Sequence, residues 1–248
     1  MERVEVNGDR GMEMSKQLLP VVARHPGLKE LMIEDTDLTG LVPQELAEAI
    51  ARVEKVELVH NPLTPHQLTA ICTTVTSSSR LKTLHFYMYS TEHEYYRDFF
   101  DLSSVNEDIL AQGVSQLEEV VLSAQLTTQQ VEAIFAAIDT SSPLKILRLF
   151  PYPLLCSTPV LCSVDPGVLA AGINKLEVVD LRRKKLTEEQ MTRILTQSLL
   201  ATNLRELHAE VNGEKNEQLM REAQGVVPQL DITDMSEGDL GYNYLLWQ

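Results

Sequence analysis

The residues in this sequence that are best suited to chemistry are its cysteines and histidines, and their spacing argues against a shared site. Three cysteines are present, and Cys156 and Cys162 have five residues between them without a second pair of metal ligands nearby. Zinc sites need three or four converging ligands, so we expect Cys72, Cys156 and Cys162 to be ordinary thiols. Neither a phosphate-binding glycine-rich loop, nor an H-E-x-x-H motif, nor a nucleophile elbow is present. The sequence therefore predicts no enzyme activity, no metal and no cofactor.

Composition narrows the classes of partner. Of the 248 residues, 44% are hydrophobic and 23% are charged, which is typical of a folded globular protein. The formal net charge is −15. Nucleic acids and anionic membrane surfaces bind through Lys and Arg, so we expect neither as a ligand. A basic protein partner is compatible with this charge, although an acidic balance is more often a solubility feature.

The chain also carries weak signals of its cellular compartment. Residues 1–8 contain no apolar segment of the kind found in secretory signals, and no apolar run approaches the roughly 20 residues that span a bilayer. The cysteine count is odd, and no Asn-x-Ser/Thr acceptor occurs. Together these features favour the cytoplasm, with the nucleus as an alternative. The one basic cluster, residues 182–185, is expected to be a solvated turn, with nuclear import or an acidic partner as its alternatives.

A short pattern, apolar-x-x-apolar-x-apolar, recurs along the whole chain and predicts a repeat architecture. Two fainter copies, at Met1 and Val227, flank the regular ones. Most regular copies begin about 28 residues apart, as expected for repeats that each contain one strand and one helix. The seven regular copies begin at Leu28, Val53, Leu81, Leu117, Leu144, Leu176 and Leu204.

Two kinds of helix start alternate between these predicted strands. Capping boxes open one kind, with Thr followed three residues later by Gln, at 64–67, 127–130 and 187–190. The other kind follows Val42, Val105 and Val164. The alternation has a period of about 60 residues, so we infer that pairs of repeats were duplicated.

The repeated pattern resembles leucine-rich repeats, and its length resembles the ribonuclease-inhibitor-like kind, which also forms the sensing regions of intracellular nucleotide-binding immune receptors. The resemblance implies an α/β solenoid, a curved horseshoe segment of about seven regular repeats with atypical caps. Its parallel sheet would lie on the concave face and its helices on the convex face. The family's loop asparagine is matched by Asn61 and Asn212 only. Thr36, Tyr89, Gln125, Tyr152 and Lys184 depart from it.

We expect one domain spanning residues 1–248. It would consist of an N-terminal capping repeat at 1–27, seven repeats at 28–212 and a C-terminal cap at 213–248, because the end repeats must cover apolar surface. An exposed aromatic docking tail is the alternative for the last segment. A free-standing adaptor or inhibitor is preferred over an excised sensing domain of an immune-type receptor. A GTPase-activating role, which similar acidic repeat proteins have, is a further alternative.

Strand alternation predicts which side chains face away from the core. It places His85 and His208 in one outward row, four strands and roughly 19 Å apart, too far to share a metal. Around the middle of the sheet it predicts apolar residues beside an Arg and a Tyr, a composition found in interface hot spots. The predicted partner-binding residues on the strands are Thr83, His85, Tyr87, Val121, Ile146, Arg148, Phe150, Val178, Asp180 and Arg182.

Two long repeats extend this prediction to adjoining loops. The excess residues follow the strands, at 86–100 and 150–162, and the first segment holds seven of the thirteen aromatic residues. Insertions in a repeat array often emerge on the binding face, so Tyr89, Tyr95 and Tyr96 join the predicted site, unless the aromatic residues pack inward instead. We therefore predict a non-catalytic module that binds a protein through its concave face and these loops; its oligomeric state is left open.

Overall fold

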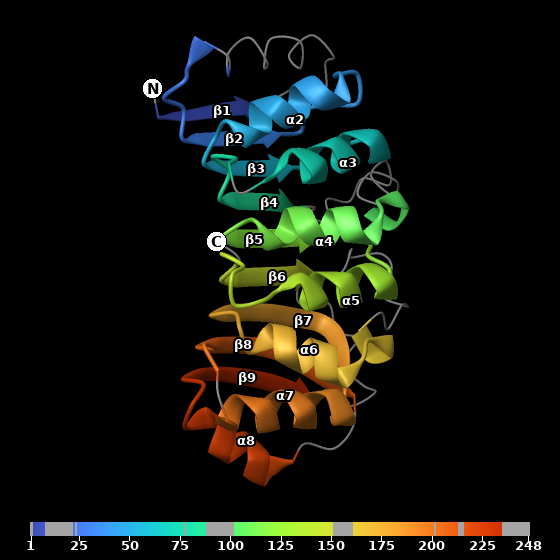
Figure 1. Cartoon of the computed structure of the whole chain (residues 1–248), viewed down its shortest axis with the longest axis vertical. Helices are drawn as coiled ribbons and strands as arrows, with labels where there is room; N and C mark the ends of the chain where they lie inside the picture. Colours follow the sequence, from blue (N-terminus) through green and yellow to red (C-terminus); the bar gives the residue numbers. More distant parts are fainter. Residues whose placement is uncertain are drawn as a thin grey trace.

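The computed structural model describes residues 2–7, 22, 24–76, 78–87, 102–150, 161–200, 202–212 and 216–234. Within these residues nine strands form one sheet, and each strand pairs in parallel with the next in sequence order (Figure 1). The strands are β1 (Arg3–Asn7), β2 (Glu30–Glu34), β3 (Lys55–Val59), β4 (Thr83–Tyr87), β5 (Glu119–Ser123), β6 (Ile146–Phe150), β7 (Val178–Thr187), β8 (Glu206–Asn212) and β9 (Gln229–Asp234).

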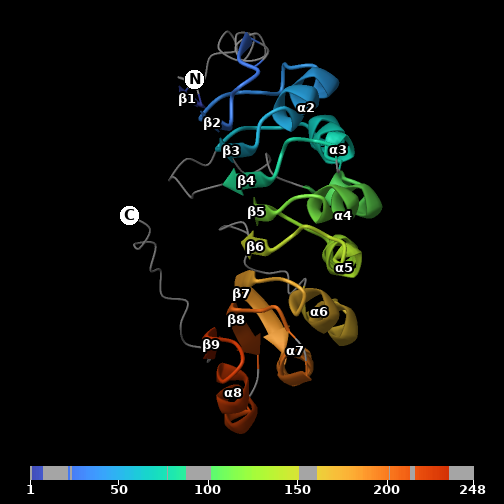
Figure 2. The same cartoon turned by 60° about the vertical axis from the view of Figure 1, so that its left-hand side comes forward.

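Helices connect the strands and cover one face of the sheet (Figure 1). Figure 2 shows the row of strands bowed, with the helices on the outside of the bow. The fold is therefore a solenoid-like α/β fold. Its concave sheet face carries none of the described helices and is called the helix-free face below. The described helices are α2 (Pro43–Ala51), α3 (Pro65–Thr74), α4 (Glu107–Ser115), α5 (Thr128–Ala137), α6 (Pro166–Ile173), α7 (Glu188–Leu200) and α8 (Glu217–Gln224), with short 3-10 turns η2 (Leu102–Ser104) and η3 (Leu161–Ser163).

The apolar pattern sets the register of the sheet, as the sequence predicts. Leu84, Leu147 and Val179 occupy equivalent positions and are 4%, 0% and 0% exposed. Each of the seven regular copies contributes one strand, and the two fainter copies form the edge strands β1 and β9. Because one repeat cannot bury its own apolar face, the core continues from repeat to repeat along the sheet.

The predicted capping boxes are confirmed, and each also joins two repeats. The Thr64 hydroxyl oxygen accepts a hydrogen bond from the backbone N–H of Gln67, and the Gln67 side-chain oxygen accepts one from the backbone N–H of Thr64. The Gln67 Nε2 then donates to the backbone oxygens of Leu38 and Leu41 in the preceding repeat, at 2.7 and 2.9 Å. Gln130 makes the same contacts with Leu102 and Val105. Gln190 makes them with Leu161 and Val164. All three glutamines are buried.

Helix packing depends on two glycines at equivalent positions of α4 and α6. A Cβ atom on Gly113 would lie 2.8 Å from the backbone oxygen of Cys72 in α3. A Cβ atom on Gly172 would lie 2.7 Å from the backbone oxygen of Phe135 in α5. Carbon and oxygen do not approach this closely without repulsion, so the absence of a side chain lets each pair of helices pack.

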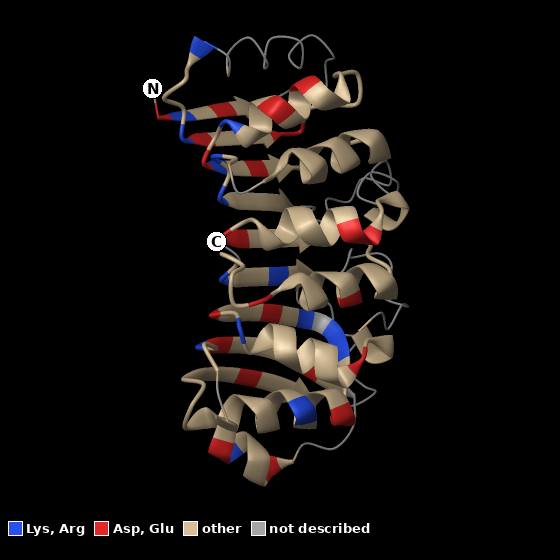
Figure 3. Ribbon diagram, in the orientation of Figure 1, with Lys and Arg blue, Asp and Glu red and all other residues tan. Residues whose placement is uncertain are grey.

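A row of alternating charge runs along the N-terminal ends of the strands (Figure 3). In this alternating ladder each backbone N–H donates to the backbone oxygen of the preceding member, as Glu118 does to Lys82 at 2.7 Å. Neighbouring side chains also form ion pairs, for example Lys29 with Glu2 and Lys82 with Glu118, both at 3.1 Å. The members are Glu2, Lys29, Glu54, Lys82, Glu118, Lys145, Glu177 and Arg205.

Candidate functional site

The structure brings most of the predicted partner-binding residues together on the helix-free face. The strand register aligns Ile146 with Val178, and it aligns His85, Val121, Arg148 and Asp180 across four strands. Thr83, Tyr87, Phe150 and Arg182 lie on the same strands. The predicted residues Tyr89, Tyr95 and Tyr96, and most of the 86–100 and 150–162 loops, lie outside the described residues.

The expectation that all of these strand residues face solvent is wrong at three positions. His85 is 6% exposed, Val121 is 1% exposed and Asp180 is 1% exposed. Val121 lies between His85 and Arg148 in the register, and the carboxylate of Glu119 contacts both of these neighbours. Polar side chains from adjacent strands therefore occupy the surface that alternation alone assigns to an exposed apolar residue.

A network of ionisable side chains crosses β3 to β6. Glu57 lies between Lys55 and His85, with Oε1 2.8 Å from the Lys55 nitrogen and 3.4 Å from Nδ1 of His85. Glu119 Oε1 lies 3.2 Å from Nε2 of His85, without good hydrogen-bond geometry, and accepts a 3.0 Å hydrogen bond from Arg148. This network fixes the Arg148 side chain against the sheet.

The network changes the acidity of both glutamates. The pKa of the Glu119 carboxyl lies below its ordinary value, because His85 and Arg148 stabilise the carboxylate against the opposing effect of burial. Burial raises the pKa of Glu57, but Lys55 and His85 more than offset this effect, so that pKa is also lowered. Both carboxylates are therefore held ionised on the sheet face.

Substituting Glu119→Gln is expected to reduce the acid sensitivity of the fold. A carboxyl with a lowered folded-state pKa stabilises the fold above its unfolded pKa of about 4.3, and this contribution is lost as the pH falls through the folded-state pKa. We expect E119Q to lose roughly 1 kcal/mol or less at neutral pH, because the pair is partly solvated. The loss should be smaller at about pH 3, because the contribution of the wild-type carboxylate fades as the pH falls toward and through its folded-state pKa.

Urea unfolding of wild type and E119Q at both pH values measures this difference. The neighbouring Glu118→Gln is the control, since Glu118 pairs with Lys82 through side chains that are about half exposed. An equal loss of stability for E119Q at neutral and acid pH would show that its effect is steric rather than electrostatic.

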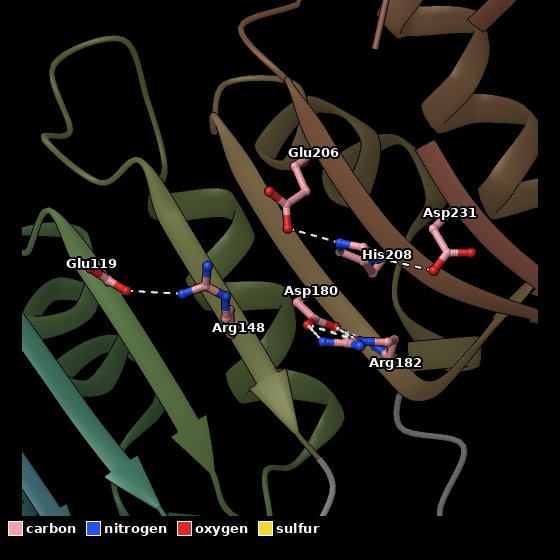
Figure 4. A network of polar contacts seen from close by, with 7 residues as sticks. All are labelled: Glu119, Arg148, Asp180, Arg182, Glu206, His208 and Asp231. Atoms are coloured by element: carbon pink, nitrogen blue, oxygen red, sulfur yellow. Dashed lines mark hydrogen bonds and ion pairs between the residues drawn. The ribbon is translucent and has the colours of Figure 1, made fainter. Parts of the chain in front are cut away.

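Figure 4 shows a second group of polar contacts on β7 to β9, beyond the Glu119–Arg148 pair. The Arg182 guanidinium donates to both carboxylate oxygens of Asp180, and the Nε–Oδ1 and Nε–Oδ2 distances are 3.0 Å. His208 lies between two carboxylates, with Nε2 2.8 Å from Glu206 and Nδ1 3.2 Å from Asp231. The buried Asp180 is thus paired, as a buried charge must be to avoid a large desolvation cost.

Apolar side chains remain partly exposed between these two polar groups. Ile146 and Val178 are neighbours on β6 and β7, and Phe150 lies on the same face of β6. Arg148 projects from the strand between Ile146 and Phe150, and its side chain is 30% exposed. The middle of the sheet therefore offers apolar surface around an anchored guanidinium.

The basic segment 182–185 is not the solvated turn that its composition suggests. It lies inside β7, where the pairing with β8 shifts register between Leu181 and Lys185. Burial lowers the pKa of Lys184 to about 8, whereas Lys185 is exposed. A shift of this kind re-aims side chains along the strand, so Arg182, Lys184 and Lys185 do not form one continuous basic patch.

The described cysteines behave as thiols held by the fold. Cys72 is buried, and burial raises its pKa to about 12. Burial also raises the pKa of Cys162, whose Sγ contacts the backbone oxygen of Lys185 at 3.1 Å. A raised pKa keeps a thiol protonated and weakly nucleophilic at neutral pH. Cys156 lies outside the described residues.

No protein-family model and no curated protein matches the chain. The two best-formed hollows lined by described residues, one between α7 and α8 and one on β1 to β3, each have room for about one water molecule. No helix in the described ranges is both long enough and apolar enough to cross a bilayer.

Two residues that shape this surface, Glu57 and Glu119, are absent from the predicted partner-binding residues, although strand alternation places both on the helix-free face. Only part of the network follows from the register, because Glu57 lies directly opposite His85. Glu119 lies opposite Thr83 and Ile146 and meets His85 and Arg148 diagonally, two residues along the neighbouring strands. A search of the aligned strands for diagonal charge pairs would find these contacts.

Proposed function

We propose that this chain is a leucine-rich-repeat protein of the ribonuclease-inhibitor-like kind that binds another protein, without catalysis, through its concave sheet face. The observation that carries the proposal is the partly exposed group Ile146, Arg148, Phe150 and Val178 at the middle of the nine-stranded sheet, on the face that none of the described helices covers. We place the protein inside the cell, and the unpaired thiols Cys72 and Cys162 support this part of the proposal.

The chemistry of this group suits a protein ligand. Interface hot spots combine apolar anchors with an arginine, and surrounding polar contacts exclude water. Here Ile146 and Val178 supply apolar area, and Glu119 holds the Arg148 guanidinium by a 3.0 Å hydrogen bond. A side chain that is already ordered loses less conformational entropy on binding, so this arrangement favours affinity.

The charge around the group suggests the character of the partner. Glu57 and Glu119 flank it on one side, and Glu206 and Asp231 lie on the other. The chain as a whole carries a formal net charge of −15. Complementary charge steers association and discriminates among partners. We therefore propose a partner that presents apolar side chains bordered by Lys or Arg.

Site-specific photo-crosslinking in the native lysate tests the proposal. A photoreactive residue at Val178 should yield a discrete protein adduct, whereas one at Arg193, an exposed residue of α7 on the helical side, should not. The substitutions Ile146→Ala and Arg148→Ala, made in the protein that carries the photoreactive residue at Val178, should weaken capture of the partner at least about tenfold. Hot-spot truncations cost about 2 kcal/mol or more.

Two controls keep this test interpretable. Circular dichroism and the melting temperature should show that the variants remain folded. Changing the exposed pair Glu188 and Glu189 on α7 to Gln should leave capture unchanged, because these residues lie on the helical side. Equal adducts from both faces, or capture that survives the Ile146 and Arg148 substitutions, would refute the proposed surface.

A further inference from the structure

Two turns at the C-terminal ends of β2 and β3 bring together three metal-ligating side chains from different repeats. Glu34 is the last residue of β2, and Asp35 follows it. His60 follows Val59, the last residue of β3, which pairs with Glu34. Asp35 and His60 thus occupy the same position in adjacent repeats, and stacking of the repeats places them side by side.

The backbone holds these two residues in an uncommon conformation. Asp35 and His60 have φ angles of 49° and 54°, a left-handed region in which Asp, Asn and His are enriched among non-glycine residues. The Asp35 amide donates to the oxygen of Val59 at 3.0 Å, and the His60 amide donates to the oxygen of Tyr87 at 3.1 Å. Each turn is therefore fixed to the next repeat before any ligand binds.

The side chains converge. Nδ1 of His60 lies 3.3 Å from Oδ1 of Asp35, and one ligand atom from each of Glu34, Asp35 and His60 lies within 4.8 Å of the others. Two ligands at zinc–ligand distances of about 2.0–2.1 Å in a tetrahedral site are separated by about 3.3 Å. The His60 side chain is 8% exposed and that of Asp35 is 45% exposed. The imidazole is therefore held by the fold, and the carboxylate of Asp35 can be reached from solvent.

A neighbouring amide ties the two turns together. Asn61 follows His60, is fully buried, and donates from Nδ2 to the backbone oxygen of Thr36 at 3.1 Å. Its Oδ1 is buried without a hydrogen-bond partner. Asn61 therefore fixes the turn that carries His60 against the turn that carries Asp35, which limits the movement needed to complete a coordination sphere.

We propose that Glu34, Asp35 and His60 form a binding site for a divalent transition-metal ion, for which zinc is the natural probe. One imidazole and two carboxylates are a ligand set that zinc accepts, with water at the remaining position. Calcium and magnesium prefer six or more ligands that are all oxygen atoms, so the imidazole selects against them. A bound ion would link the repeats that contain β2 and β3, near the acidic edge of the sheet where the chain begins.

Calorimetric titration of the intact chain with Zn²⁺, Ca²⁺ and Mg²⁺ tests the site. Wild type should bind zinc with one strong site and neither of the other ions comparably. His60→Asn and Asp35→Asn should each weaken zinc binding at least about tenfold, as expected for loss of a ligand. Asparagine is the chosen replacement because it also accepts a positive φ, and melting curves without metal should show that both variants are folded.

His208 provides a matched control. It also lies between carboxylates, but each of its nitrogens contacts a different one, Glu206 or Asp231, so the three groups do not converge on one point. His208→Asn should leave the strong zinc site intact. Bound Co²⁺ should give visible absorption typical of nitrogen and oxygen ligands, and H60N should abolish it. Absence of a strong zinc site, or one that persists in both H60N and D35N, would overturn the proposal.

Discussion

Replacing Gln130 with alanine is expected to lower the free energy of unfolding by about 3 kcal/mol or more. The Gln130 side chain is 1% exposed and satisfies three backbone groups at once. Its Oε1 accepts from the Thr127 amide, and its Nε2 donates to the backbone oxygens of Leu102 and Val105, both at 2.6 Å. A buried polar group left without a partner costs about 1–3 kcal/mol, so the loss of three contacts exceeds the cost of an ordinary helix cap.

Urea unfolding of Q130A against a matched variant measures this effect. Gln129 is adjacent, of the same residue type and exposed, so Gln129→Ala should change stability by no more than about 0.5 kcal/mol. Gln130→Glu should be nearly as damaging as Q130A, because it replaces the donating amide with an oxygen that faces two carbonyls. A loss below about 1 kcal/mol for Q130A would show that water or a local shift restores the missing contacts.

Gly172→Ala is expected to destabilise the protein by about 1–2 kcal/mol, although alanine favours helices. The new Cβ atom would lie 2.7 Å from the backbone oxygen of Phe135 and 2.9 Å from its Cδ1 atom. Phe135 is 1% exposed and cannot move away without disturbing the core. Overpacking of this kind costs about 1–3 kcal/mol or more, and this cost outweighs the gain of about 1 kcal/mol from helix propensity.

Thermal and urea unfolding of G172A and a control variant test this packing argument. A Cβ atom on Gly27 would meet nothing within 4 Å, so Gly27→Ala should be neutral, or stabilising by about 0.5 kcal/mol through the unfolded state. Gly113→Ala should resemble G172A, because its Cβ atom would meet the backbone oxygen of Cys72 at 2.8 Å. A G172A protein as stable as wild type would mean that α5 and α6 can separate at little cost.

The apolar spacing predicted the sheet because burial is decided locally along each strand. The three-residue interval between Leu81 and Leu84, followed by the two-residue interval to Phe86, defines inward positions, and all three residues are buried. The capping boxes were equally predictable, since the Thr and its Gln lie in one turn. The hydrogen bonds by which each glutamine joins its repeat to the preceding one were not predictable. Their acceptors are loop carbonyls about 25 to 29 residues away in the sequence.

The candidate surface was predicted less completely than the sheet. Alternation along a strand gives the face on which a side chain lies, and it placed Val121 and Asp180 correctly on the helix-free face. It does not give the depth of a side chain, which depends on how neighbouring strands' side chains pack around it. The set formed by Glu34, Asp35 and His60 escaped sequence analysis for a related reason, since the residues meet only through the stacking of two repeats.

The alternating ladder has a consequence for how the chain assembles. Similar repeats can pair out of order during folding, a characteristic hazard of repeat arrays. If one repeat were skipped, Lys82 would face Lys29, or Glu118 would face Glu54, across strands about 4.8 Å apart. Like charges in such positions are destabilising, whereas the native order places Lys82 beside Glu118 at 3.1 Å. The sign of one side chain per repeat thus disfavours a misassembled sheet in which a single repeat is skipped.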